Sequence, residues 1–114
     1  MKTLKFKGFK AQWILDGVKT ATMRLFDDKD LQVRDELELV NSDDGEIFAT
    51  AVITEVTYKK AGEVEDVDLD GHEKWNSREE MLDSLKKYYG DKINPGTEVK
   101  IVRFRLTKKR GTMK

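Results

Sequence analysis

The sequence predicts one small α+β domain: a mainly antiparallel β-sheet, curled into a small barrel, with helices on its flanks. Stretches with the two-residue alternation of β-strands are separated by short turn sequences, which is typical of an antiparallel sheet. Two other stretches carry apolar residues at helical spacing, and each ends at a glycine. Closing a strongly twisted sheet into a barrel would remove its exposed edges.

Length and composition favour a single domain. The chain has 114 residues, 38% of them apolar, which is enough to bury one modest core. We predict a domain over residues 1–107 and a frayed basic tail over 108–114, which could touch phosphates. Lys plus Arg and Asp plus Glu both number 22, so any attraction for nucleic acid must be local.

The residue inventory excludes several classes of chemistry. With no cysteine and with His72 as the only histidine, disulfides, thiolate nucleophiles and the usual zinc sites are excluded. The stretch 66–71 opens like a calcium-binding loop, but Ser77 occupies the twelfth position, where a bidentate glutamate is needed. We therefore expect no metal and no cofactor. No signal peptide or membrane-spanning run is visible, so we expect a cytoplasmic protein without a membrane partner.

The first elements are a short helix and a strand. Phe9, Trp13 and Ile14 recur at helical spacing and predict a helix over 9–16 whose apolar side faces the core, with Gly17 ending it. Residues 20–25 then alternate, and predict a strand with one apolar face and one face bearing hydroxyls and a guanidinium.

The middle of the chain predicts an antiparallel pair of strands. Residues 26–32 are polar and predict a loop, and 33–40 alternate, with Leu37 and Leu39 inward. Gly45 can supply the positive φ of a hairpin turn over 41–45. The β-branched and aromatic stretch 46–59 then predicts a long strand covered on both sides.

The last part predicts a capped helix and a final strand. Ser77 and Glu80 have the spacing of a capping box, and the apolar stripe from Met81 to Tyr89 ends at Gly90. Residues 94–96 form a turn. The strand over 97–106 changes apolar parity between Ile101 and Val102, which indicates a bulge or burial on both faces.

Two segments carry candidate site residues. After Gly17, the chain presents Lys19, Thr20, Thr22 and Arg24, a pattern that suits an anion or a nucleobase. The plain alternative is a lysine that complements a helix dipole, with threonines that only form a strand. Ahead of the second helix, Trp75 can stack on a base, or pack on the helix as a hydrophobic staple does.

The segment 13–24 resembles the opening motif of the ASCH domain family, which runs aliphatic, Gly, any, Lys-Thr, any, Thr, any, Arg. The strand over 46–53 resembles the family's long second-half strand, and 73–77 resembles its Glu-Gly-aromatic-any-Ser entry to the last helix. Lys74 stands where the family prefers glycine, and Arg34-Asp35 where it has Gly-Asp. The resemblance spans about residues 4–106 and implies a PUA-like barrel with a cleft for RNA or nucleotides.

The resemblance also implies an activity. Compact bacterial members of the family include an amidohydrolase that removes the acetyl group from N4-acetylcytidine with a lysine, a threonine and a glutamate. Carried over by motif, these are Lys19, Thr22 and Glu73, with Arg24, Thr20 and Trp75 as nucleotide- or RNA-binding residues. The alternative is an RNA- or nucleotide-binding module without catalysis.

Two catalytic routes are open. Thr22 can be the nucleophile with Lys19 as its base, and Glu73 can then protonate the leaving amine. Alternatively Glu73 acts as base on a water while Lys19 and Thr22 stabilise the oxyanion. The sequence sets neither the route nor the oligomeric state.

Overall fold

The computed structural model describes residues 1–26, 29–72 and 74–109. Five strands and two α-helices make up the domain, with two short 3₁₀ helices, η1 and η2, after the longest strand. The elements are β1 Lys2–Phe6, α1 Gly8–Leu15, β2 Ala21–Arg24, β3 Glu36–Asn41, β4 Ile47–Lys60, η1 Ala61–Glu63, η2 Asp66–Leu69, α2 Arg78–Tyr89 and β5 Glu98–Lys109.

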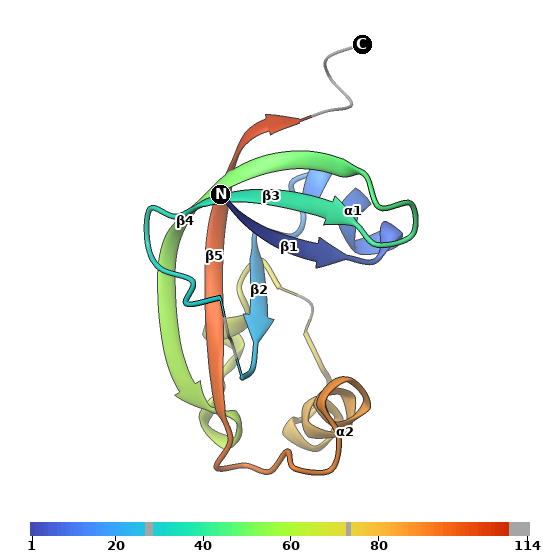
Figure 1. The fold of residues 1–114 in the computed structure, drawn as a ribbon. Helices are drawn as coiled ribbons and strands as arrows, with labels where there is room; N and C mark the ends of the chain where they lie inside the picture. Colours follow the sequence, from blue (N-terminus) through green and yellow to red (C-terminus); the bar gives the residue numbers. More distant parts are fainter. Residues whose placement is uncertain (27–28, 73, 110–114) are drawn as a thin grey trace.

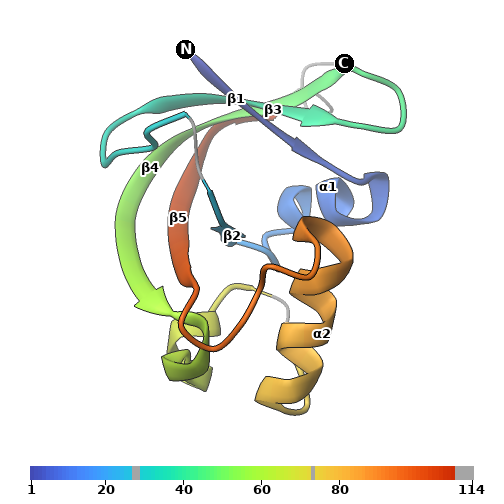
Figure 2. The same cartoon turned by 60° about the horizontal axis from the view of Figure 1, so that its bottom comes forward.

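The five strands form one mixed sheet in the order β1-β3-β4-β5-β2. Only β1 and β3 pair in parallel; the other three pairings are antiparallel. Figures 1 and 2 show that β4 and β5 are long and strongly curved, so that the sheet curls into a half-barrel. Its edges, β1 and β2, turn toward the side where α1 and α2 stand. The predicted α+β class and the predicted curled, mainly antiparallel sheet are confirmed.

Buried side chains form two clusters that share β5. Val102 and Phe104 belong to the cluster with β1, β3, β4 and α1, whereas Val99 and Ile101 belong to the cluster with β2 and α2. The change of parity in β5 thus reflects burial on both faces. The bulges fall elsewhere: in the β4–β5 ladder the register shifts between Thr50 and Ala51 and between Ile53 and Glu55.

The turns and caps agree closely with their sequence signatures. Gly45 has φ +74° in the β3–β4 hairpin, and Gly90 has φ +91° at the end of α2. The Glu80 N–H donates to the Ser77 hydroxyl at 3.1 Å, so the predicted N-cap is present. The Glu80 carboxylate, however, reaches Asn76 rather than the Ser77 backbone, so only half of the capping box forms.

One strand was not predicted, and the ends of several elements differ from prediction. The unpredicted strand is β1, in which Leu4 and Phe6 are buried at strand spacing. β3 begins at Glu36 rather than at 33, because Arg34 takes φ +78° in a turn. β5 continues to Lys109, past the predicted end of the strand at 106. The predicted 108–114 tail therefore begins inside a strand, and residues 110–114 lie outside the described part.

Candidate functional site

A cleft of about 310 Å³ lies between the two edges of the sheet and the two helices. Arg24 of β2 spans this gap: its Nη2 donates to the Lys5 carbonyl of β1 at 3.3 Å, and its guanidinium lies 5.2 Å from the centre of the Phe6 ring. The cleft thus occupies the place where the half-barrel stays open. Its remaining walls come from α1, from the segment that leads into β2, from His72 and Trp75, and from α2.

The turn after α1 brings Lys19 into the cleft. Gly17 has φ +80°, and its N–H donates to Ile14 O at 3.1 Å. The amides of Val18 and Lys19 then both donate to Trp13 O, at 2.9 and 3.1 Å. These bonds satisfy the last carbonyls of the helix and reverse the chain within three residues. The predicted role of Gly17 is confirmed.

Lys19 and Thr22 are polar side chains that are almost fully buried, with exposed fractions of 4% and 5%. Both line the cleft. The Lys19 Nζ donates to the carbonyl of Ala21 at 2.8 Å, which folds the side chain back along the start of β2. A buried lysine is uncommon in a domain of this size, because removing an ammonium from water is unfavourable.

Successive side chains of β2 and its flanking residues point alternately to the core and to the cleft, but not all of them follow this pattern. Ala21 and Leu25 are buried in the core as predicted, and Thr22 and Arg24 face the cleft. Met23, on the apolar face, also lines the cleft. Thr20 does not: it is exposed, and its N–H donates to Gly71 O at 2.8 Å. Thr20 therefore joins two segments of backbone instead of facing the cleft.

Aromatic side chains form much of the cleft wall. The rings of His72 and Trp75 lie 5.6 Å apart, and both residues line the cleft. Trp75 also borders a second cavity, of about 250 Å³, beside the start of α2. Glu73, the third member of the predicted trio, lies outside the described residues; its chain neighbour His72 is in the cleft wall.

The mouth of the cleft departs from the sequence prediction. Phe9 and Trp13 were expected in the core, but 52% and 38% of their surface is exposed, and the two rings meet edge to face at 5.2 Å. Ala11 and Ile14 supply the core contact of α1 instead. Tyr88, at the end of α2, is also exposed at the mouth, with the Lys7 and Lys10 ammonium groups 5.7 and 5.4 Å from its ring centre.

The described part of the chain holds neither a cluster of metal-binding side chains nor a helix suited to a membrane. No three acidic, histidine or cysteine side chains gather there as a metal site. Within the same residues, no helix is long and apolar enough to cross a membrane. The acidic stretch 66–71 forms η2 and a turn, and Asp68 pairs with Lys59 at 2.9 Å.

The sequence matches no protein-family model and no curated protein, but solved structures resemble the fold. A protein of Enterococcus faecalis, described under the family DUF984, superposes with a TM-score of 0.78 at 16% identity, over 96% of this chain and 82% of that one. An ASCH domain from Lactobacillus crispatus gives 0.73 at 15%, over 94% and 80%. An ASCH protein from Zymomonas mobilis gives 0.66 at 9%, over 90% and 65%. The chain therefore has the PUA-like fold of the ASCH domains.

Proposed function

We propose that this protein is a nucleoside amidohydrolase whose substrate is N4-acetylcytidine or a related acylated nucleoside. The observation that carries the proposal is the pair Lys19 and Thr22, which are buried yet line a cleft. Buried polar side chains are uncommon, and these two also border a space that a ligand can enter. The resemblance of residues 17–24 to the ASCH motif assigns catalytic roles to the same two residues.

The shape of the cleft suits a nucleoside. Its volume of about 310 Å³ is at the small end of the range of ligand pockets. The Trp75 and His72 rings offer flat faces for a pyrimidine, and aromatic stacking is the usual way in which proteins hold an extruded base. Arg24, at the gap between β1 and β2, supplies a fixed positive charge beside the bound molecule.

The reaction would be hydrolysis of the exocyclic amide. A nucleophile adds to the acetyl carbonyl, the carbon–nitrogen bond to N4 breaks, and N4 takes a proton, so that water is consumed and cytidine and acetate leave. In this proposal Lys19 either takes the Thr22 proton or, with the Thr22 hydroxyl, donates hydrogen bonds to the oxyanion. The assignment of Glu73 as acid or base rests on the motif alone.

A second candidate, an RNA-binding module without catalysis, is favoured by the mouth of the cleft. Lys7 and Lys10 lie there beside the exposed rings of Phe9 and Tyr88. Cations next to exposed aromatic rings suit a single strand, whose phosphates pair with lysine and whose bases stack. Binding of this kind weakens steeply with salt, whereas turnover of a neutral nucleoside depends little on ionic strength.

The proposal is tested by incubating the protein with N4-acetylcytidine and following cytidine by chromatography. The informative variant is Thr22→Val, which keeps the volume and the β-branched shape but removes the hydroxyl. We expect turnover by the wild type and a loss of about 100-fold in Thr22→Val, the usual effect of removing one group that acts on the transition state.

The matched control is Thr50→Val. Thr50 lies on β4 outside the cleft, where its hydroxyl bonds that of Thr107 at 2.8 Å. It should retain wild-type turnover. Absence of cytidine at high protein concentration, together with salt-sensitive binding of a single-stranded RNA, would replace the hydrolase by the binding module.

A further inference from the structure

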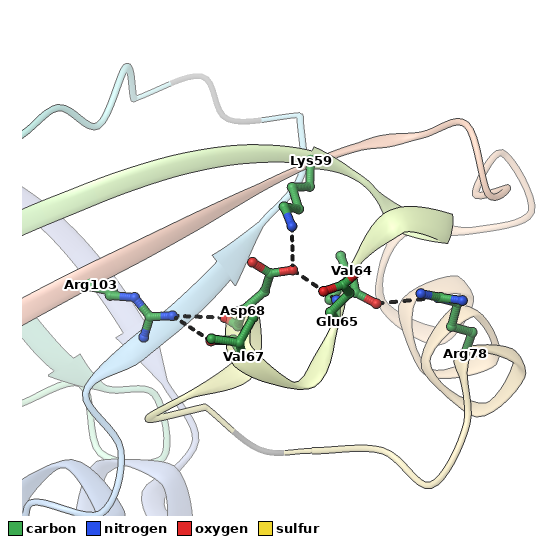
Figure 3. A network of polar contacts seen from close by, with 7 residues as sticks. All are labelled: Lys59, Val64, Glu65, Val67, Asp68, Arg78 and Arg103. Atoms are coloured by element: carbon green, nitrogen blue, oxygen red, sulfur yellow. Dashed lines mark hydrogen bonds and ion pairs between the residues drawn. The ribbon is translucent and has the colours of Figure 1, made fainter.

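Arg103 of β5 holds the segment that leads into the cleft wall. Its guanidinium donates to three backbone carbonyls of that segment: to Asp68 O at 3.0 Å, to Val67 O at 3.4 Å, and to Asp70 O. Figure 3 shows Arg103 and Lys59 reaching this segment from two different directions. The Nε bonds the Glu55 carboxylate at 2.9 Å, but 58% of that glutamate side chain is exposed.

These carbonyls lie at the end of η2, where a helix leaves some acceptors without internal partners. Val67 O also accepts from the Asp70 N–H at 3.4 Å. A guanidinium can serve several acceptors at once because its five N–H groups are fixed in one plane. Asp68 is also held by a second contact, since its carboxylate accepts from Lys59 at 2.9 Å and from the Glu65 N–H at 2.8 Å. Segment 67–70 is thus clamped by side chains from both β4 and β5.

The clamped segment is joined directly to the start of β2. Gly71 O accepts from the N–H groups of Thr20 and Ala21, at 2.8 and 3.1 Å. Gly71 has φ +75°, and a Cβ there would fall 2.0 Å from the Thr20 hydroxyl, so the two backbones are in close contact. Ala21 is also the residue opposite Arg103 in the β2–β5 ladder. Arg103 therefore lies next to the point where the segment after η2 is bonded to the start of β2, and both segments lead into walls of the cleft.

Trp75, in the far wall, packs against the buried cluster of β2 and α2 but is only partly enclosed. Trp75 borders the cleft on one side and the 250 Å³ cavity on the other, so there is space on both sides of it. Its position therefore depends on this packing and also on the segment ahead of it, of which residues 67–72 are described and are held by Arg103 and by the bonds of Gly71.

We infer that Arg103 is a positioning residue for the cleft. Arg103 does not line the cleft, but its contacts set the position of His72 and Trp75. These two residues are thereby held at a fixed distance from Lys19 and Thr22. The inference rests on the proposed function in taking this cleft as the ligand site. A purely structural arginine would instead stabilise the whole sheet without any particular effect on Trp75.

The test uses fluorescence, because the chain has two tryptophans, Trp13 and Trp75, and both line the cleft. In a Trp13→Phe background the emission reports Trp75 alone. Arg103→Met should shift that emission to longer wavelength and raise acrylamide quenching about twofold, while far-ultraviolet circular dichroism keeps its sheet signal. The KM for N4-acetylcytidine should rise about tenfold, which corresponds to weakened stacking of one base, with a smaller change in kcat.

Two further variants separate positioning from stability. Glu55→Gln removes the charged partner but leaves the three carbonyl contacts, so Trp75 quenching and KM should stay at wild-type values. Arg103→Lys keeps the charge but not the planar fork, so it should give an intermediate shift. If Arg103→Met does not fold, Arg103→Lys decides by the same two readouts.

Unchanged Trp75 quenching in a folded Arg103 variant would overturn the inference, even if the wild type hydrolyses the substrate. A Trp75 shift without turnover by any variant, the wild type included, would uphold the positioning role and reject the hydrolase. The two proposals therefore fail separately.

Discussion

Among the residues that the structure describes, two lysines, Lys19 and Lys100, are buried to nearly the same extent, with exposed fractions of 4% and 5%. Lys100 lies in β5, opposite Tyr58 of β4, with its ammonium 5.4 Å from the centre of that ring. Lys19 precedes β2, and its ammonium donates to the Ala21 carbonyl at 2.8 Å. One lysine is enclosed by the sheet, whereas the other lines a cleft.

The difference teaches that burial of a charge does not by itself mark a functional site. The surroundings of Lys100 compensate its burial: an aromatic face attracts a cation, and its charge acts on Asp35. The pKa of Asp35 is held below its usual value mainly by the hydrogen bond from Lys2, then by the Gln32 N–H, with a smaller part from Lys100. Lys19 differs in that a ligand in the cleft would reach it.

The largest predicted effect comes from replacing each lysine by methionine, which keeps the length and removes the charge. Lys19→Met should lower turnover of N4-acetylcytidine at least about 100-fold, because it removes a group that acts on the reacting amide. Lys100→Met should retain turnover within about twofold. The measurement compares the initial rates of the two variants with that of the wild type at saturating substrate. Urea unfolding establishes that both variants are folded. Equal losses of turnover in Lys19→Met and Lys100→Met would show that the buried lysine of the cleft has no role that the buried lysine of β5 lacks.

A second pair of variants compares glycines. Gly45→Ala places a Cβ in open space at φ +74°, so it should lower the free energy of unfolding by about 1–2 kcal/mol, the conformational penalty alone. Gly71→Ala adds a contact of 2.0 Å with the Thr20 hydroxyl and should cost more. Because Gly71 joins the two cleft walls, it should also weaken substrate binding. Equal unfolding energies, or an unchanged KM for Gly71→Ala, would show that this junction does not shape the Lys19 region.

The smallest effect concerns the pH dependence of stability. Burial would raise the pKa of Asp68, but the hydrogen bond from Lys59, the Glu65 N–H and the charges of Lys59 and Arg103 together lower it. A carboxyl whose pKa is lower in the folded state stabilises the fold above its unfolded pKa of about 3.9 and loses this contribution as the pH falls through the folded value.

Asp68→Asn should therefore be less stable than the wild type at neutral pH, and the difference should shrink as the pH falls below about 4. Urea unfolding at several pH values measures it. Turnover at neutral pH should change much less than in Lys19→Met, since Asp68 does not line the cleft and its carboxylate only helps to hold segment 67–70. A pH-independent difference would mean that the Lys59–Asp68 pair does not act through the charge of Asp68.

The sequence predicted best those features that depend on neighbouring residues. The Ser77 cap, the Gly45 hairpin and the Gly17 reversal each follow from a few adjacent residues, and each is present. The motif after Gly17 was equally local, and the structure brings Lys19, Thr22 and Arg24 together with the distant Trp75.

Features that depend on distant partners were missed. β1 has only 5 residues, and its parallel pairing with β3 joins segments more than 30 positions apart. Helical spacing indicated that Phe9 and Trp13 share a face, but what lies opposite that face depends on where α2 packs. The contacts of Arg103 could not be predicted either, because its three partners are backbone carbonyls, which every residue type has.

The most direct test of the central claim, that the cleft is the ligand site, is a titration of ¹⁵N-labelled protein with cytidine, followed by two-dimensional NMR. Cytidine is the product of the proposed reaction and binds without turnover. We predict shifts at the amides of Lys19 and Thr22 and at the Trp75 indole, with none at Lys100. Shifts confined to residues outside the cleft, or no shifts at millimolar cytidine, would contradict the account.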